Sequence, residues 1–380
     1  MKRNAKINVR IDSETKERAE ETLKMDNSNM ADYVRWSING LVDSRNKEIN
    51  PSFDNKKNSL IFGNAGSGKS YFGIRDILLN SKDNFIISLF DRGLYDEFSN
   101  KFENIEVINL TDADKSTVSF NFLDYIENDS DMEFIVNHII EDEFKFEDKI
   151  IKDYLIKVIK KSSEDKTYKK IYEYLDVILK SDEILEEYKP IIKKVLPRIV
   201  DVFKEIQFFD NEKPKLDFKN FIYGKSNLFI FSERPKDNIL VRKLIIEACL
   251  SAFSYQNGQS EFYTNIVVDE AHVLGYLYNL ETFLNKTHIK NASIHIATQS
   301  LYYFYKKCYL DFEVYFLMGN LHYFDKSELF ELIYRTNQEQ AFYLLAYLYS
   351  RELKIDKFRS FVEYIVIDVD ERGIGIFKKE

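Results

Sequence analysis

A single glycine-rich motif, GNAGSGKS at residues 63–70, leaves few folds open to this chain. The motif follows the apolar run SLIF and precedes the amphipathic stretch SYFGIRDILL, so we expect it to connect a strand to a helix. Its glycines allow the backbone to curl around a phosphate group, and the following helix directs its positive end at the same anion. The pattern predicts an α/β protein built around a phosphate-binding loop.

Every position of the motif is a candidate contact for a nucleotide. The candidate nucleotide-binding residues are Gly63, Asn64, Ala65, Gly66, Ser67, Gly68, Lys69 and Ser70. In a motif of this kind the lysine can reach the β- and γ-phosphates of ATP, and the serine hydroxyl can ligate Mg²⁺. A glycine-rich turn without nucleotide is the alternative, but the flanking strand and helix favour ATP.

A second apolar run, NIVVDE at residues 265–270, ends in two carboxylates. Adjacent residues of a strand point to opposite sides, so the two acids can have different tasks. We expect Asp269 to hold Mg²⁺ through water, and Glu270 to orient and deprotonate the attacking water. A strand that merely ends in an acidic turn is the alternative.

Polar side chains follow two further apolar runs. Gln299 comes directly after SIHIAT, where its amide could detect the γ-phosphate and couple its loss to movement, or could simply cap the next helix. Asp91, at the end of NFIISLFD, is a further candidate for the same cleft. Residues 269–272 spell the helicase motif DEAH. Helicases of that class need a second domain with an arginine-rich motif after it, and no such motif follows here, so we interpret His272 as a helix-start residue.

Short apolar runs recur after residue 58 and predict a mainly parallel sheet. These runs are LIFG, NFIISLFD, IEVINL, NLFIFS, NIVVDE and SIHIAT, and the C-terminal FVEYIVIDVD and ERGIGIF predict two more strands. Residues 130–205 lack this signal and carry apolar residues at helical spacing between Lys and Glu. We therefore divide the chain into a small N-terminal unit at 1–45, a linker at 46–57, an ATPase domain at 58–129 and 206–380, and an all-helical insertion at 130–205.

The overall composition limits where the chain acts and what it binds. The formal net charge of −9 excludes a polycation that coats nucleic acid, so any contact with DNA must be local. Cys249 and Cys308 are far apart, which excludes a disulfide framework or a cysteine zinc site. No apolar run is long enough to span a bilayer, and the N-terminus lacks the apolar stretch of a signal peptide. We expect a cytoplasmic protein.

The first 45 residues form a separate pattern. KINVRI alternates apolar and polar residues as an edge strand does, and two helical stretches, TKERAEETLKM and DYVRWSINGLV, follow it. The unit resembles the ribbon-helix-helix family, in which two chains pair their strands and place polar side chains in the major groove of DNA. The resemblance implies these DNA-binding residues: Lys2, Arg3, Lys6, Asn8 and Arg10. A dimerisation module that never contacts DNA is the alternative.

The remainder of the chain, from Asn58 onward, resembles a second family. The order of GNAGSGKS, FNFLD, a helical stretch, VVDEAH and ATQS is similar to that of the conjugative DNA-transfer ATPases of type IV secretion. These belong to the HerA/FtsK superfamily of RecA-like P-loop motors. The resemblance implies ATP and Mg²⁺ as cofactors, a catalytic set of Lys69, Glu270 and Gln299, and a metal pair of Ser70 and Asp269. It also implies a hexameric ring in which an arginine of one subunit reaches the ATP of the next.

The sequence departs from this family at two points. Relatives often carry arginine just before the sensor strand, where this chain has Lys286, Thr287, His288 and Lys290. Other candidates for the arginine that acts across subunits are Arg234, Arg335 and Arg351. The transmembrane segment usual in coupling proteins is missing, so recruitment to the inner face of the membrane would depend on a partner.

We hypothesise an ATP-driven DNA translocation motor for conjugative transfer of a plasmid or mobile element, tethered to DNA by the N-terminal unit. Expected partners are duplex DNA, further copies of the chain, and relaxase or membrane-channel proteins. One alternative is an ATPase that powers assembly of a secretion channel or protein export. The other is a DNA-binding regulator or partition factor that nucleotide switches.

Overall fold

The computed structural model describes most of the chain between residues 56 and 318 and three C-terminal strands. The continuous stretches are residues 56–80, 83–125, 213–234, 238–255, 260–286, 291–301, 311–318, 361–368 and 373–379, with residues 355–356 and a few single positions elsewhere. The N-terminal unit at 1–45, with its five DNA-binding candidates, lies outside the described residues. So does the linker, except for residues 56 and 57.

A ten-stranded sheet forms the centre of the described part, in the order β10-β9-β7-β1-β6-β5-β2-β4-β3, with β8 paired to β9. The strands are β1 (Ser59–Gly63), β2 (Asn84–Leu89), β3 (Ile105–Asn109), β4 (Asn227–Phe231), β5 (Thr264–Val268), β6 (Ala292–Thr298), β7 (Val314–Met318), β8 (Ile355–Asp356), β9 (Phe361–Asp368) and β10 (Gly373–Lys379). Neighbouring strands from β7 to β3 are parallel, whereas β8, β9 and β10 join by antiparallel pairing. The α/β fold with a mainly parallel sheet is therefore as predicted.

All eight apolar runs that predicted strands form strands, because residues buried on both faces of a parallel sheet must be apolar at nearly every position. Every residue of β1, β2, β4, β5 and β6 is buried. Strand β7, with the sequence VYFLM, was not predicted, although it pairs directly with β1. It makes β1, the strand that precedes the phosphate loop, an interior strand of the sheet instead of an edge strand.

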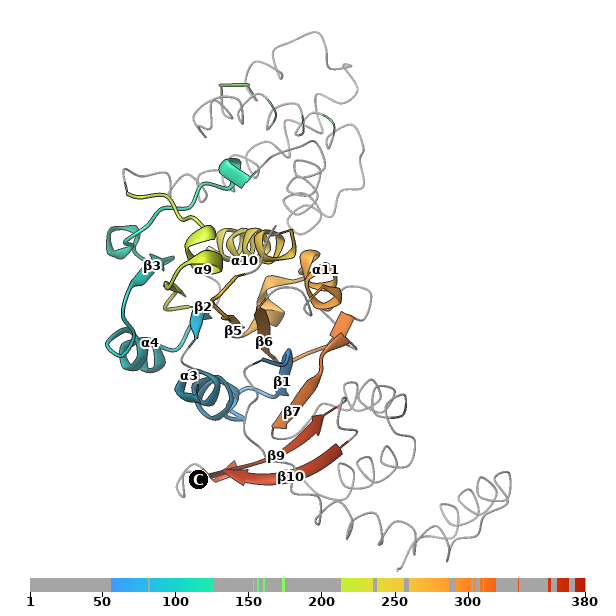
Figure 1. Ribbon diagram of the computed structural model, residues 1–380. Coiled ribbons are helices and arrows are strands. Elements are labelled where there is room, and N and C mark those ends of the chain that lie inside the picture. The colour runs from blue at the N-terminus through green and yellow to red at the C-terminus, as the bar shows by residue number, and fades with distance from the viewer. Residues whose placement is uncertain are drawn as a thin grey trace, which may run out of the picture.

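Helices cover both faces of the sheet (Figure 1). They include α3 (Arg75–Asn80), α4 (Arg92–Ser99), α9 (Lys219–Tyr223), α10 (Ile239–Ser254) and α11 (Asn279–Asn285). Short turns of helix are η1 (Lys69–Ile74), η2 (Ala113–Lys115), η3 (Phe122–Tyr125) and η4 (Ala271–Leu274). Helices α9, α10 and α11 pack on one face of the sheet, and α3 and α4 pack on the other.

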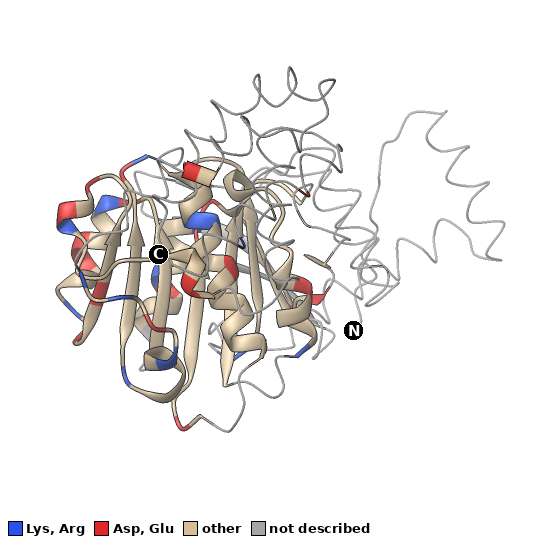
Figure 2. Cartoon of the chain, turned by 90° about the horizontal axis from the view of Figure 1, so that it is seen from above, with Lys and Arg blue, Asp and Glu red and all other residues tan. Residues whose placement is uncertain are grey.

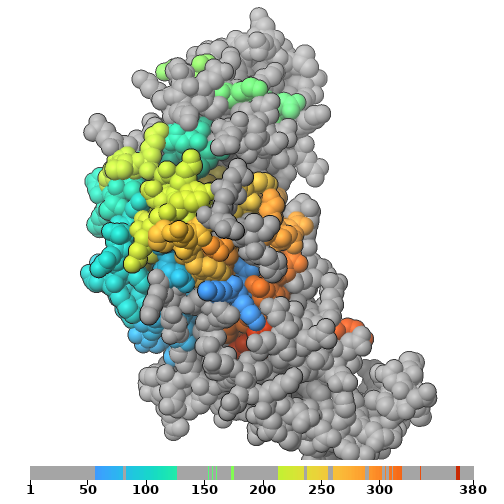
Figure 3. Space-filling view, in the orientation of Figure 1, coloured from blue at the N-terminus to red at the C-terminus, as the bar shows by residue number. Residues whose placement is uncertain are grey.

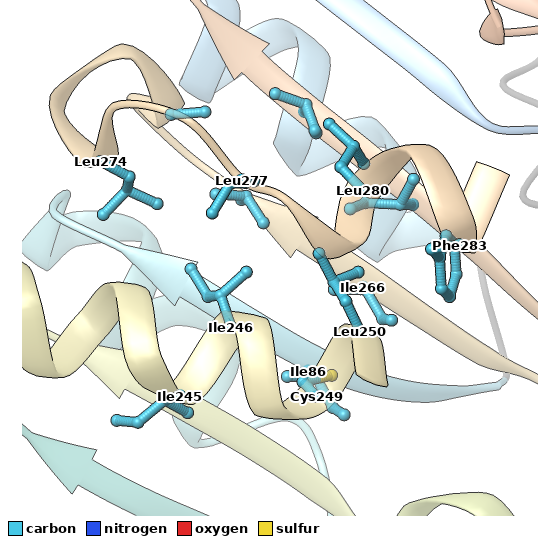
Figure 4. Close-up of a cluster of buried hydrophobic side chains, with 14 of the residues drawn as sticks. Ile86, Ile245, Ile246, Cys249, Leu250, Ile266, Leu274, Leu277, Leu280 and Phe283 are labelled. Atoms are coloured by element: carbon cyan, nitrogen blue, oxygen red, sulfur yellow. The ribbon is translucent and has the colours of Figure 1, made fainter. Parts of the chain in front are cut away.

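Helix α10 supplies most of the buried helical residues on its face of the sheet. Figure 4 shows Ile246 and Leu250 of α10 in one buried cluster with the strand residue Ile266 and the α11 residues Leu280 and Phe283. Its sequence, ILVRKLIIEACLSAFS, is apolar around most of its circumference, as expected for a helix enclosed by both a sheet and a second helix. Arg242 and Lys243 are two of its charged residues, and both are almost completely buried.

The start of β1 is tied to residues from late in the chain. The backbone N–H and the side-chain amide of Asn58 both donate to the carboxylate of Glu313, at 2.6 and 3.0 Å. Tyr263 donates its hydroxyl to the carbonyl of Lys56 at 3.0 Å. Figure 3 shows blue residues from the beginning of the described chain in contact with orange residues from later in the sequence. The phosphate loop thus follows a strand that is anchored at its beginning.

Of the predicted insertion at residues 130–205, the structure describes five residues, and all five are helical. Two of them, Ile156 and Tyr174, pack against the same core cluster to which α10 contributes. The boundaries of the insertion stay a prediction. None of the described helices has both the length and the apolarity that crossing a bilayer requires.

Candidate nucleotide-binding and hydrolysis site

The candidate site lies where three neighbouring parallel strands end. Strand β6 lies between β1 and β5, so the loop after β1, the acidic turn after β5 and Gln299 after β6 meet at one edge of the sheet. Ligand sites of α/β folds form at this edge, at the carboxyl ends of the strands. Residues separated by more than two hundred positions in the sequence therefore come together.

The glycine-rich loop needs backbone conformations that favour glycine. Gly66 and Gly68 have φ angles of 73° and 92°, in the left-handed region that side chains disfavour. The loop closes by a hydrogen bond from the N–H of Ser67 to the carbonyl of Asn64 at 3.1 Å, and η1 begins directly after Gly68. The hydroxyl of Ser67 is buried and has no partner among the described residues, which fits a loop shaped for a polar ligand.

Replacing Gly63 by alanine is expected to lower the free energy of unfolding by about 3 kcal/mol. A Cβ atom at this position would lie 2.1 Å from the carbonyl oxygen of Met318 in β7, and backbone on both strands leaves little freedom to move. Thermal denaturation followed by circular dichroism measures the loss. Gly93→Ala is the matched control, because its Cβ would meet only the side chain of Asp91, at 3.1 Å. Equal melting temperatures for the two variants would contradict this account.

Lys69 lies inside the loop, with only 3% of its surface exposed. Its ammonium group donates to the carbonyls of Gly63 and Asn64 at 2.8 and 3.0 Å. Burial lowers the pKa of Lys69, and the nearby carboxylates of Glu270 and Asp269 oppose that shift. The cation is thus held at the position from which it can reach a phosphate bound in the loop.

Ser70 and Asp269 are in direct contact. The Ser70 hydroxyl donates to the Asp269 carboxylate, at 3.0 Å to Oδ2 and 3.2 Å to Oδ1. Asp269 is 2% exposed, and burial followed by repulsion from Glu270 raises its pKa to about 6. The Ser70 hydrogen bond and the charges of Arg242 and Lys69 oppose the rise. A hydroxyl beside a buried carboxylate is a donor set that suits Mg²⁺.

The backbone changes direction at Glu270, directly after strand β5. Its φ of 50° is unusual for a residue with a side chain, and it ends the strand in a sharp turn. The side-chain amide of Gln299 donates to Oε2 of Glu270 at 2.7 Å, and Nδ1 of His272 lies 3.2 Å from the same oxygen. Gln299 therefore contacts the second acid of the pair, a contact that the sequence did not reveal.

Among the described residues, the other candidates from the sequence form no hydrogen bond or ion pair with the loop or the acidic turn. Asp91 caps α4, accepting the N–H of Leu94 at 2.9 Å, so its carboxylate has a structural task. Arg234 is exposed, and the ammonium of Lys286 lies 4.1 Å from the centre of the Tyr255 ring. The candidates outside the described residues are Thr287, His288, Lys290, Arg335 and Arg351.

A buried arginine that was not predicted from the sequence lies next to the acidic pair. Arg242 of α10 is completely buried and donates from Nη2 to the backbone carbonyl of Asp269 at 2.9 Å. The available signal was a charged pair, Arg242 and Lys243, within the otherwise apolar stretch ILVRKLII. The stretch alone does not indicate which residue the arginine contacts.

The sheet order, the glycine-rich loop and the acidic turn together define a RecA-like P-loop NTPase fold. Solved structures agree with this assignment. The plasmid coupling protein TrwB in complex with the GTP analogue GDPNP is similar with a TM-score of 0.62 and 12% identity, over 86% of each chain. TrwB in complex with ADP and Mg²⁺ gives 0.60 and 13%, over 86% of this chain and 85% of that one.

A second similar structure is VirB4 of Thermoanaerobacter pseudethanolicus. Its TM-score is 0.56 at 16% identity, over 85% of this chain and 89% of that chain. No family model matches the sequence, and no curated protein matches it. At these identities the likeness establishes the fold.

Proposed function

We propose that this protein is a Mg²⁺-dependent ATPase that drives DNA transfer, similar in role to conjugative coupling proteins. The observation that carries the proposal is the contact between Ser70 and Asp269, 199 positions apart in the chain, with Lys69 held beside them. A phosphate loop alone binds many anions, whereas its contact with a buried acid is the arrangement that a metal–nucleotide complex requires.

The candidate residues divide the chemistry between them. The loop of residues 63–70 would bind the phosphates, with Lys69 on the β- and γ-phosphates, and Ser70 and Asp269 would hold Mg²⁺. The metal ion, when bound, neutralises charge that develops on the transferred phosphoryl group. Glu270 would accept a proton from the attacking water, and Gln299 orients its carboxylate through the 2.7 Å hydrogen bond.

The sensor role of Gln299 has a physical basis in this contact. Gln299 follows β6, which lies between the strand of the phosphate loop and the strand of the acids. A change in the charge or position of Glu270 after loss of the γ-phosphate changes its hydrogen bond to Gln299. In this proposal the end of β6 responds to hydrolysis.

The assignment to DNA transfer is supported by the similarity to TrwB, whose structures are described as those of a bacterial conjugative coupling protein. We infer a ring of identical subunits, with DNA in its channel. In the described part, acidic and basic residues are interspersed in the view of Figure 2. Any DNA-contacting surface is therefore expected to be a local one, consistent with the net charge of −9.

The N-terminal unit would add recognition of a DNA site. Paired strands of two chains would place Lys6, Asn8 and Arg10 in the major groove, while Lys2 and Arg3 contact phosphates. Arginine and lysine are suited to guanine, and asparagine to adenine. In this proposal the unit tethers the motor to its site, and relaxase or membrane-channel proteins recruit the assembly to the membrane.

An ATPase that powers a secretion channel is the second candidate, favoured by the similarity to VirB4 over most of both chains. Both candidates use the same hydrolysis site and differ in what is moved. A nucleotide-switched DNA-binding regulator is the third, and it predicts slow turnover with an affinity for DNA that differs between ATP and ADP.

Addition of DNA should raise the rate of ATP hydrolysis several-fold if DNA is the substrate. Phosphate release by the full chain is measured with Mg²⁺, with and without long single-stranded and duplex DNA of random sequence. Arg10→Ala is the control. Stimulation of hydrolysis by random-sequence DNA should persist in this variant. Its preference for one duplex over a random pool should fall by about 1–3 kcal/mol in binding free energy. Hydrolysis that no DNA stimulates would favour the secretion-channel ATPase.

A further inference from the structure

Arg242 joins three elements beneath the acidic turn. From the first turn of α10 its Nε donates to the hydroxyl of Ser88, near the end of β2, and its Nη2 donates to the carbonyl of Asp269 at 2.9 Å. The guanidinium carbon lies 3.4 Å from the centre of the Phe90 ring, so the group is stacked on an aromatic face. None of its surface is exposed.

The contact with Asp269 fixes a peptide group. The carbonyl of Asp269 and the N–H of Glu270 belong to one planar peptide and point in opposite directions. Arg242 holds the carbonyl, and the N–H donates to Oδ1 of Asp269 itself at 3.0 Å. With both ends of the plane held, the turn at Glu270, whose φ is 50°, has little freedom to rotate.

Core packing alone does not explain an arginine at this position. Burial lowers the pKa of Arg242 to about 9, and the carboxylates of Asp269 and Glu270 oppose the shift, so the group stays charged at neutral pH. Its Nη1 is buried and has no acceptor among the residues that the structure describes. A buried charge with an unsatisfied donor is unfavourable, and an apolar residue of similar volume often serves a core equally well.

We propose that Arg242 is a positioning residue that holds the Asp269–Glu270 peptide, so that Asp269 faces Ser70 while Glu270 faces the attacking water. The inference rests on the proposed function, because it assigns to Arg242 the orientation of the acids used for ATP hydrolysis. In the described structure Arg242 donates no hydrogen bond to the carboxylate group of Asp269 or of Glu270. It acts through the backbone that separates them.

The test compares Arg242→Met with Lys243→Met in the full chain. Lys243 is the next residue of α10, also cationic and 1% exposed, and its ammonium lies 5.8 Å from the ring centre of Tyr278 instead of at the acidic turn. For Arg242→Met we expect kcat to fall about 100-fold, with the KM for ATP nearly unchanged and the Mg²⁺ concentration for half-maximal rate raised. Lys243→Met should keep the wild-type kcat, and Arg242→Lys should recover part of the loss, because one ammonium can replace one of the two donors.

A double-mutant cycle with Glu270→Gln separates positioning from general loss of structure. If Arg242 acts through Glu270, adding Arg242→Met to Glu270→Gln should lower kcat by less than about threefold further. Melting temperatures of the single variants, and of Arg242→Lys if Arg242→Met does not fold, show whether the fold is retained. The inference is wrong, and the proposed function stands, if the two substitutions lower kcat additively or if Arg242→Met has the kcat of the wild type. A wild-type chain without ATP hydrolysis overturns the proposed function, and the inference with it.

Discussion

Substitution of Lys69 by alanine is expected to reduce ATP hydrolysis by about 10³-fold or more. Lys69 is 3% exposed, and its ammonium group donates to two loop carbonyls at 2.8 and 3.0 Å, so alanine leaves no cation at this position. The variant removes the positive charge that would offset the γ-phosphate as its bond breaks. Phosphate release under saturating ATP and Mg²⁺ measures the effect.

The control for Lys69→Ala is Lys101→Ala, which removes an exposed cation far from the loop and should leave the rate unchanged. Lys69→Ala should still bind DNA through the N-terminal unit, since the substitution leaves that unit intact. Arg10→Ala should show the reverse, with hydrolysis retained and site recognition weakened. Full turnover by Lys69→Ala would show that the site is assigned to the wrong residues.

Glu270→Gln should lower hydrolysis by about 10²–10⁴-fold while ATP binding is retained. Glutamine keeps the size of the side chain and can still contact Gln299, which donates to Glu270 at 2.7 Å. It loses the negative charge that accepts a proton from water. Single-turnover phosphate release gives the chemical step, and equilibrium binding of a fluorescent ATP analogue gives the affinity.

Glu233→Gln removes an exposed carboxylate after β4 and provides the matched control for charge and size. Its turnover is expected to equal that of the wild type. If Glu270→Gln instead lowered the affinity for ATP by the same factor as the single-turnover rate, Glu270 would contribute to ATP binding. Another group would then have to serve as the base.

The strands and the site were predictable because their signals are local. A strand buried on both faces requires a short apolar run, and a loop that binds phosphate requires glycine where φ is positive, as at Gly66 and Gly68. Acids that follow such a run lie at the same sheet edge as the loop. Ser70 and Asp269 could thus be placed together from sequence, although no residue pattern gives their distance.

Features that depend on the assembled fold were not predictable. Strand β7 lies in a stretch crowded with aromatic residues, LYYFYKKCYLDFEVYFLMG, in which its five residues have no distinguishing alternation. Arg242 lies on a helix whose sequence gives no indication of its partner, because the partner is a backbone carbonyl 27 positions away. The contact of Gln299 with Glu270 likewise follows from the neighbouring positions of β5 and β6.

The position of β6 between β1 and β5 determines which segment of the chain follows the candidate site. The chain turns sharply after Thr298, whose hydroxyl donates to the carbonyl of Ser300 at 3.0 Å, and continues toward β7. In that connection Phe304 and Phe312 meet edge to face with ring centres 6.1 Å apart, and both pack on the core of the α10 face. In the proposed motor, a displacement at Gln299 would therefore pass first to the residues between β6 and β7, and the variant Phe312→Ala should weaken the coupling of hydrolysis to movement more than hydrolysis itself.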